Sequence, residues 1–285
     1  MKIGFIGAGK VGCSLGRYFS DSHLDVAGFY DAASQAAQEA ADFSQVCAYD
    51  NKEALVNDCD ILFLTVPDGL IKQVWNQIKD FPVEGKYICH CSGALSAGDA
   101  FPEVKERGAF GYSIHPLFAV SDKFHSYKEL SHAYFTIEGD DSHVSDITAM
   151  LEGLGNQVRH IKAEDKTKYH CAAAVVSNHI VGILASGMDL MTQCGFDEKS
   201  ALQALSPLIL GNVNHVLTYG PTASLTGPVE RGDISTVQKH LNCLDTDKDK
   251  LLYSLISEKL VEIGKKKNPS RDYSKLTEVL REVTN

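Results

Sequence analysis

Apolar and polar residues alternate along the first 161 residues in short blocks that repeatedly predict a strand followed by a helix. The uninterrupted apolar run Ile61–Val66 is typical of a parallel strand that is buried on both faces. Apolar residues at helical spacing, as in Leu70–Ile78, predict helices between such strands. The predicted strands are Lys2–Ile6, Val26–Tyr30, Val46–Tyr49, Ile61–Val66, Tyr87–Cys91, Phe110–Ile114, Tyr134–Ile137 and Val158–Ile161. The alternation predicts an α/β fold with a doubly wound, mostly parallel sheet.

Beyond Ile161 the strand patterns stop and only helical patterns remain. Tyr169–Cys194 is predicted to be one long helix whose many small residues allow close packing, either in a core or in a dimer seam. Pro207 is expected to bend or break the next helix, Asp197–Val216. A loop over Tyr219–Asp233 and helices over Ile234–Asn242, Lys248–Gly264 and Tyr273–Val283 follow. We therefore predict an α/β domain over residues 1–162 and an all-α domain over residues 163–285.

A glycine motif of the form G-x-G-x-x-G lies directly after the first predicted strand, at Gly7, Gly9 and Gly12. In a dinucleotide-binding unit these glycines permit a tight turn, close approach of the backbone to a diphosphate, and close packing of helix on strand. The amino end of the following helix supplies N–H donors and partial positive charge. The predicted cofactor-binding residues are Gly7, Gly9, Lys10, Val11, Gly12, Asp31, Val66 and Pro67. A glycine-rich turn without a ligand is the alternative.

Asp31 ends the second predicted strand, near the offset of about 20 residues at which a carboxylate binds the adenosine ribose. Such a carboxylate accepts hydrogen bonds from the ribose hydroxyls and repels a 2′-phosphate. No arginine follows it within residues 32–41. We therefore expect NAD(H) to be favoured over NADP(H).

The net charge of −10 argues against a nucleic-acid partner, which requires a basic face. No run of about 18 apolar residues is evident, and no signal-peptide pattern precedes the first strand, so we expect a cytoplasmic protein without a membrane partner. The eight cysteines are scattered and predict small buried side chains. The segment Cys89-His90-Cys91 resembles a metal clip. On a strand, however, the thiols face one way and the imidazole the other, so no metal site is predicted.

Polar residues at the carboxyl ends of the predicted strands are the first candidates for chemistry, because ligands of open α/β sheets bind there. They are Pro67-Asp68, Ser92-Gly93 and His115-Pro116. His115 would hydrogen-bond a substrate hydroxyl and take its proton; a histidine satisfied by loop backbone is the alternative. Ser92 would orient a substrate oxygen, or else cap the segment that follows.

Two further groups of polar residues lie in the helical region. His170 and Asn178 share one face of the long predicted helix, where they either line the site or form an interhelical hydrogen bond. Arg231, together with Thr226 and Gly227, is the candidate for binding a substrate carboxylate or phosphate, and a surface salt bridge is the alternative. Asp233 is expected to cap the helix that starts at Ile234.

The whole chain resembles the family of Rossmann-like proteins that carry the helical domain known as DUF2520, within the 6-phosphogluconate dehydrogenase-like superfamily. The resemblance implies a dinucleotide-binding domain, an all-α domain that forms a homodimer, and NAD(P)-dependent oxidoreductase activity. Some members carry names such as pyrroline-5-carboxylate reductase. The matching segments are IGFIGAGKVG at 3–12, HCSGALSA at 90–97, SIHPLFA at 113–119, HCAAAVVSNH at 170–179 and ASLTGPVERGD at 223–233.

A more distant similarity concerns mechanism. The SIHPLFA segment looks like the part of prephenate and arogenate dehydrogenases that carries their catalytic histidine, which implies that His115 polarises a substrate hydroxyl and that Ser92 matches their active-site serine. Asn178 departs from the serine-histidine pair of those enzymes. The β-hydroxyacid dehydrogenases of the superfamily use a lysine one turn before such an asparagine. The residue here is Ala174, which shifts acid–base work to His115 or His170.

These observations predict hydride transfer to or from a small acidic hydroxy or keto compound in a cleft between the two domains. The predicted catalytic residues are His115, Ser92, Asn178 and His170, and the predicted substrate-binding residues are Arg231, Thr226 and Gly227. One alternative is a dinucleotide-binding dimer without catalysis, a sensor or scaffold, which the missing lysine favours. The other is imine reduction of the kind that pyrroline-5-carboxylate reductase performs.

Overall fold

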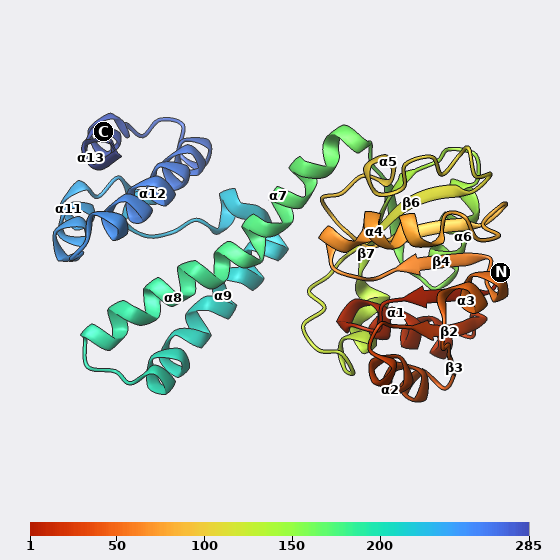
Figure 1. The fold of residues 1–285 in the computed structure, drawn as a ribbon. Helices are drawn as coiled ribbons and strands as arrows, with labels where there is room; N and C mark the ends of the chain where they lie inside the picture. Colours follow the sequence, from red (N-terminus) through yellow and green to blue (C-terminus); the bar gives the residue numbers. More distant parts are fainter. Residues whose placement is uncertain (285) are drawn as a thin grey trace. The chain divides into compact units, whose positions relative to one another are not determined.

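The computed structural model describes residues 1–284, and its first half is built on one eight-stranded sheet (Figure 1). The strand order is β3-β2-β1-β4-β5-β6-β7-β8, with every neighbouring pair parallel except β6 and β7. The strands are β1 (Ile3–Ile6), β2 (Val26–Tyr30), β3 (Cys47–Ala48), β4 (Ile61–Leu64), β5 (Tyr87–His90), β6 (Phe110–Leu117), β7 (Tyr134–Gly139) and β8 (Gln157–His160). The predicted doubly wound, mostly parallel sheet is confirmed.

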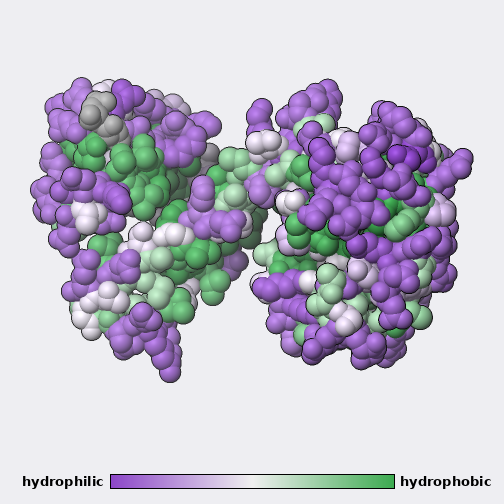
Figure 2. Space-filling view, viewed as in Figure 1, coloured by the Kyte–Doolittle hydropathy of each residue, from purple (hydrophilic) through white to green (hydrophobic). Residues whose placement is uncertain are grey.

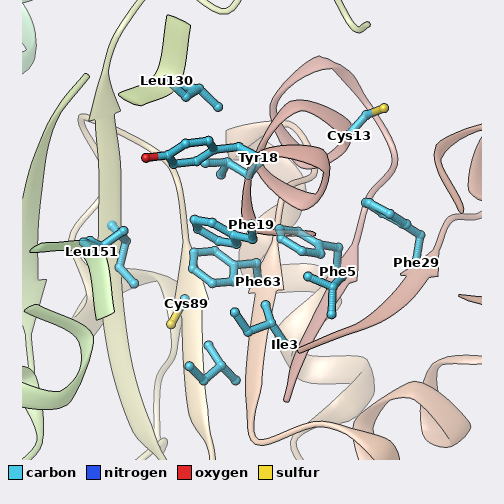
Figure 3. Close-up of a cluster of buried hydrophobic side chains, with 14 of the residues drawn as sticks. Ile3, Phe5, Cys13, Tyr18, Phe19, Phe29, Phe63, Cys89, Leu130 and Leu151 are labelled. Carbon is cyan, nitrogen blue, oxygen red and sulfur yellow. The ribbon is translucent and has the colours of Figure 1, made fainter. Parts of the chain in front are cut away.

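Helices cover both faces of this sheet, as the alternating pattern predicts. They are α1 (Lys10–Asp21), α2 (Ser34–Ser44), α3 (Lys52–Asp58), α4 (Asp68–Ile78), α5 (Ala97–Ala100) and α6 (Val144–Gly153), with the 3₁₀ helix η1 (Ser126–His132). One face carries a cluster of aromatic side chains (Figure 3). The Phe5 ring stacks on Phe29 and Phe63, with centroids 5.2 and 5.4 Å apart. The close-packed rings fix the helices of this face against the strands.

The opposite face has a second core, centred on Trp75 of α4. The Trp75 side chain is fully buried, and its indole N–H donates a hydrogen bond to the carbonyl oxygen of Pro102 at 2.8 Å. A buried indole requires such a partner. The expected packing of this tryptophan on the sheet is confirmed.

The strand β6 runs three residues past its predicted end at Ile114. Pairing of β5 with β6 stops at His90 and Ser113, but antiparallel pairing with β7 continues to Leu117. Past Ser113 the strand therefore has β7 on one side only, the kind of edge where a proline such as Pro116 is tolerated. This extension carries His115 beyond the edge at which β5 ends.

The chain divides into two compact units, Met1–His179 and Ile180–Asn285. After the 3₁₀ helix η2 (Ala163–Asp165), all regular elements are helices, as predicted for this region. They are α7 (Lys166–Val176), α8 (Asn178–Gln193), α9 (Glu198–Ser224), α10 (Pro228–Arg231), α11 (Ile234–Cys243), α12 (Asp247–Lys267) and α13 (Ser274–Thr284). The second unit has its own small core around Val237, Tyr273 and Leu280. The predicted domain boundary between residues 162 and 163 stays a prediction.

Two helix predictions in this region are wrong. The predicted single helix Tyr169–Cys194 is interrupted at Ser177, whose hydroxyl donates to the Ala173 carbonyl oxygen at 2.7 Å, a contact that bends helices. Pro207 lies inside α9 and the backbone there stays helical, so the expected break is not found at this proline, while the expected bend stays a prediction. The helix breaks instead at Gly220, where φ is +79°, just before Pro221. The predicted loop Tyr219–Asp233 thus contains the end of α9 and all of α10.

The stretch Ala163–Gln193 is long and apolar enough to cross a membrane by length and composition alone, contrary to the sequence-based expectation. A single such stretch is weak support for a membrane span, because packed helices of soluble proteins pass the same test. Large apolar side chains are nevertheless exposed on α8 and α9, including Val181, Leu208 and Leu217 at 66%, 63% and 79%. Figure 2 shows such hydrophobic surface on the helical unit. A surface of this kind is usually covered by another molecule.

Candidate functional site

The glycine turn after β1 has the geometry that a bound diphosphate requires. Gly7 adopts φ +109°, and a Cβ at Gly12 would collide with the Gly7 carbonyl oxygen and the Thr65 hydroxyl. By contrast, a Cβ at Gly9 would meet nothing within 4 Å, and no side chain caps α1 at this residue. The N–H groups at the amino end of α1 therefore face open space across bare backbone. Phosphate groups bind at helix ends of this kind.

Asp31 closes the other side of this turn. Its carboxylate accepts hydrogen bonds from the N–H groups of Ala8 at 2.8 Å and Ala33 at 2.9 Å. A cavity of about 340 Å³ lies beside it, lined by five of the predicted residues: Gly7, Gly9, Asp31, Val66 and Pro67. Lys10 and Val11 lie in the first turn of α1. The cavity lies where the sequence predicts the adenosine ribose of a dinucleotide.

Lys52 also lines this cavity, and no sequence pattern predicted it. The residue begins α3, and its ammonium lies 5.4 Å from the centre of the Tyr30 ring and donates to the Gln77 side chain at 2.5 Å. Only the pairing of β2 beside β1 brings this helix to the pocket. A cation therefore stands near Asp31, although none follows Asp31 directly in the chain.

A second cavity, of about 450 Å³, brings together three of the four predicted catalytic residues. His115 lines it from the β6 extension, His170 from α7 and Asn178 from the start of α8. The remaining walls are mostly apolar, with Tyr169 and Ser177 as the other polar members. All of these residues belong to the first unit. A small, mainly apolar pocket with a few convergent polar groups is the usual form of a ligand site.

The two imidazoles meet above Gly93. A Cβ at this glycine would lie 2.7 Å from Cδ2 of His170 and 2.9 Å from Nε2 of His115, so the absence of a side chain permits their approach. The ring centroids are 6.4 Å apart. On its other side, Nδ1 of His115 forms a 2.8 Å hydrogen bond with the Tyr169 hydroxyl.

The charge state of His115 follows from these surroundings. Burial lowers the pKa of His115 to about 4, helped by the positive charge of Lys166 and by His170. The ring is therefore neutral near pH 7, and the one ring nitrogen that carries no hydrogen is able to accept a proton. A neutral ring is the form that a general base requires, and a pKa of about 4 makes it a weak base at pH 7.

Ser92 makes the contacts of a cap and does not line the second cavity, so its role towards a substrate stays a prediction. Its hydroxyl accepts hydrogen bonds from the N–H groups of Ala94 at 3.3 Å and Leu95 at 3.0 Å, as a cap would. The same hydroxyl donates to the Asp68 carboxylate at 2.6 Å. Ser92 and Asp68, from the ends of neighbouring strands, thus meet at the sheet edge where the sequence placed both of them.

Lys166, the first residue of α7, is the buried charge that the sequence reasoning missed. It looked like part of an exposed charged connection, yet it is only 1% exposed. Its ammonium donates to the Ser92 carbonyl oxygen at 3.1 Å and to the Ser113 hydroxyl at 2.6 Å. Burial lowers its pKa to about 8.

Thr226, Gly227 and Arg231 lie in the second unit, around the short helix α10. Gly227 adopts φ +98° just before that helix, and Arg231 is its last residue. Their role in substrate binding stays a prediction. Asp233 does cap α11, because its carboxylate accepts from the Thr236 N–H at 3.0 Å.

The Cys89-His90-Cys91 segment has the alternation that the sequence predicts. Cys89 and Cys91 pack in the aromatic core of one face, while the His90 ring lies edge-on to Phe101 of the other. Among residues 1–284, no group of three or more histidine, cysteine or acidic side chains is placed to hold a metal ion.

Comparison with known protein families matches both halves of the chain. Residues 1–116 match the Rossmann-like domain, and residues 133–260 match the domain of unknown function DUF2520. The chain thus combines a Rossmann-like domain at its amino end with a DUF2520 domain after it. Its sequence matches none of the curated proteins.

Solved structures similar to this chain share its fold over nearly the full length. Protein TM1727 from Thermotoga maritima is 26% identical, with a TM-score of 0.73, over 93% of this chain and 99% of that one. A proposed NADP oxidoreductase from Bacteroides fragilis, BF3122, is 20% identical, with a TM-score of 0.68, over 92% and 98%. The pyrroline carboxylate reductase of Plasmodium falciparum, solved with NADP bound, is 16% identical, with a TM-score of 0.61, over 93% and 98%.

The buried His90 predicts a pH dependence of stability. Burial lowers the pKa of His90 to about 3 in the folded protein, against about 6.5 when unfolded. Below about pH 6.5 the unfolded chain binds a proton that the folded chain does not, so stability falls as the pH falls. The loss is about 1.4 kcal/mol per pH unit. Urea unfolding at several pH values should show that His90→Gln removes this part of the slope.

His132→Gln is the matched control, because the His132 side chain is 78% exposed. This variant should keep the wild-type dependence of unfolding free energy on pH. An unchanged slope in His90→Gln would contradict the assignment of a neutral buried ring.

Proposed function

We propose that this protein is an NAD(P)-dependent oxidoreductase. The observation that carries the proposal is the open amino end of α1 behind Gly9, next to the cavity that contains Asp31. The α1 end and Gly9 would hold the diphosphate, Asp31 the adenosine ribose, and Val66 and Pro67 the region near the nicotinamide. When bound, the nicotinamide would donate or accept hydride at a substrate carbon.

The side chains of the second cavity supply what hydride chemistry at a hydroxyl-bearing carbon requires. Neutral His115 accepts the hydroxyl proton in the oxidative direction and returns it in the reductive direction. Tyr169 holds Nδ1 of the ring, which leaves Nε2 for the substrate. Asn178 and the Ser92–Asp68 pair orient the substrate oxygen, and His170 is the second candidate for proton transfer. We propose that Arg231, with Thr226 and Gly227, binds an acidic group of the substrate.

Imine reduction is the second candidate reaction. An iminium carbon is already electrophilic, so its reduction depends less on an acid–base group, and the alanine at position 174 fits that lower demand. The fold is similar to that of a pyrroline carboxylate reductase and to that of an imine reductase from Myxococcus stipitatus. The imine reductase is 16% identical, with a TM-score of 0.55, over 99% of this chain and 93% of that one. These similarities support including cyclic imines among the compounds to be tested.

We also propose that NAD(H) is favoured over NADP(H). The Asp31 carboxylate lies in the cavity and would repel a 2′-phosphate. The positive charge of Lys52, in the wall of the same cavity, would attract a 2′-phosphate. Its ammonium, however, already contacts Gln77 and Tyr30. Tighter binding of NADP(H) than NAD(H) in parallel titrations would overturn this preference.

The exposed apolar side chains of α8 and α9 support a homodimer that forms through the helical region. Both helices are rich in large apolar residues with exposed fractions well above those of a buried core. A second copy of the same chain offers an equally apolar surface, and such self-complementary interfaces are the commonest kind in soluble oligomers. We propose that this surface is covered by a second copy in the active protein.

Dinucleotide binding is tested by Gly9→Ala. The added methyl group enters open space, so the fold should be kept, while the approach of a diphosphate to bare backbone should be lost. At about 100 times its Kd, a dinucleotide should raise the unfolding free energy of the wild type by about 2.7 kcal/mol. Gly9→Ala should show little of this gain in thermal-shift and calorimetric titrations.

Gly153→Ala is the control for this experiment, because its new methyl group also meets open space, at the end of α6. It should respond to dinucleotide like the wild type. Failure of the wild type to bind NAD(H) or NADP(H) would contradict the proposed function.

Catalysis is tested by His115→Ala. Hydroxy acids, keto acids, amino acids and cyclic imines are offered with both cofactors, and turnover is followed by the absorbance of the reduced nicotinamide. With any active compound, His115→Ala should lower kcat by about 10² to 10⁴ fold and leave dinucleotide binding unchanged. His125→Ala, which alters an imidazole that is 73% exposed, should keep full activity. Binding without turnover of any compound would favour a non-catalytic dinucleotide sensor.

The homodimer is tested by Leu217→Arg in light-scattering measurements. Leu217 is 79% exposed within one chain, so a charge there would be buried only in a dimer. We expect the wild type to have twice the mass of one chain and Leu217→Arg to shift towards the monomer. Glu278→Arg, on the exposed side of α13, should not change the mass. A wild type that is monomeric at all concentrations would refute the proposal.

A further inference from the structure

Lys166 occupies a place where a charged side chain is costly. The residue is 1% exposed, and no carboxylate lies within 4.0 Å of its ammonium in the part of the chain that the structure describes. Its two hydrogen-bond acceptors are both neutral, the Ser92 carbonyl oxygen and the Ser113 hydroxyl. An ammonium buried without a direct counter-ion destabilises a protein, and an apolar side chain of similar length would fill the space at lower cost. Packing alone therefore does not account for a lysine here.

The hydrogen-bond partners of Lys166 lie at the ends of the two strands that lead to the candidate site. The Ser113 hydroxyl also donates to the Ser92 carbonyl oxygen at 3.0 Å, so the three groups form a closed triangle. Ser92 follows β5, and Ser113 is the last residue of β6 that pairs with β5. His115 is two residues farther along β6 and therefore points to the same face of the strand as Ser113.

We infer that Lys166 is a positioning residue for the site, whose buried ammonium joins the carboxyl ends of β5 and β6 and sets the charge that His115 experiences. This role serves the proposed function, but the experiment that tests the role does not depend on that function. Lys166 is buried and is not among the residues that line the cavity. It therefore acts on His115 and Ser92 rather than on a substrate directly.

The electrostatic consequence concerns His115. After burial, the positive charge of Lys166 is the next largest cause of the lowered pKa of His115, because two like charges disfavour each other. The neutral imidazole is the form that accepts a proton. Several titratable groups face Lys166 or His115. They are Asp68 of α4, His90 at the end of β5, Cys91 just after it, Glu138 of β7, and Tyr169 and His170 of α7.

The test compares Lys166→Met with Lys166→Gln in the full-length protein. Both substitutions remove the charge, but glutamine keeps an N–H donor for Ser113 and therefore remains informative if the methionine variant does not fold. Lys168→Met is the matched control, because Lys168 lies on the same helix and is exposed. Folding is checked by circular dichroism, and the pKa of His115 is measured by NMR of ring-labelled histidine, with His115→Gln to assign the signal.

We expect the pKa of His115 to rise by about one pH unit or more in each folded Lys166 variant and to stay unchanged in Lys168→Met. An unchanged pKa of His115 in a folded Lys166→Gln or Lys166→Met protein would overturn the inference, even if the melting temperature falls, because that result is what a purely structural role produces. The measurement needs neither cofactor nor substrate. Absence of dinucleotide binding in the wild type would refute the proposed function and leave this result standing.

Discussion

The close packing of α1 on the turn after β1 is the constraint on which the proposed cofactor site depends. The Thr65 hydroxyl, just past β4, donates to the Gly7 carbonyl oxygen at 2.7 Å, and Gly12 of α1 fits against both groups only because it has no side chain. This contact joins β1, β4 and the first turn of α1 at one point. It fixes the direction of the helix, and therefore the place to which its N–H groups point. If the helix were displaced, its N–H groups would no longer lie beside the cavity that contains Asp31, and the proposed diphosphate would lose these donors.

The same sheet edge determines the second half of the site. Because β1, β4 and β5 are parallel, their carboxyl ends bring Gly7, Asp68 and Ser92 to one side of the sheet. The antiparallel strand β7 then extends β6 past this edge and lifts His115 into the cavity. Topology thus places the phosphate-binding turn and the imidazole on one rigid unit. Catalytic groups positioned by strands are held more precisely than groups on loops.

The sequence predicted those parts of the site that depend on local chemistry. The glycine spacing gave the turn, the apolar runs gave the strands, and the residues at strand ends gave Ser92 and His115. It did not predict Lys52, Lys166 or Tyr169, because each owes its place to long-range packing. Lys166 in particular stands among charged residues at 162–168 that look solvated, and only the docking of α7 on the sheet buries it. The helix breaks at Ser177 and Gly220 were also not predicted. The break at Ser177 accompanies one side-chain hydrogen bond, and the break at Gly220 follows from one positive φ angle.

The position of the lysine along the helix limits the chemistry that this protein can perform. A lysine at position 174 would line the cavity wall, where Ala174 now lies. Lys166 is eight residues earlier, or about 12 Å along a helix, and its ammonium reaches the backs of Ser92 and Ser113 instead. Lys166 is not among the residues that line the cavity. In the proposed reaction, proton transfer is assigned to the imidazoles of His115 and His170, and the lysine would act on it through the charge state of His115.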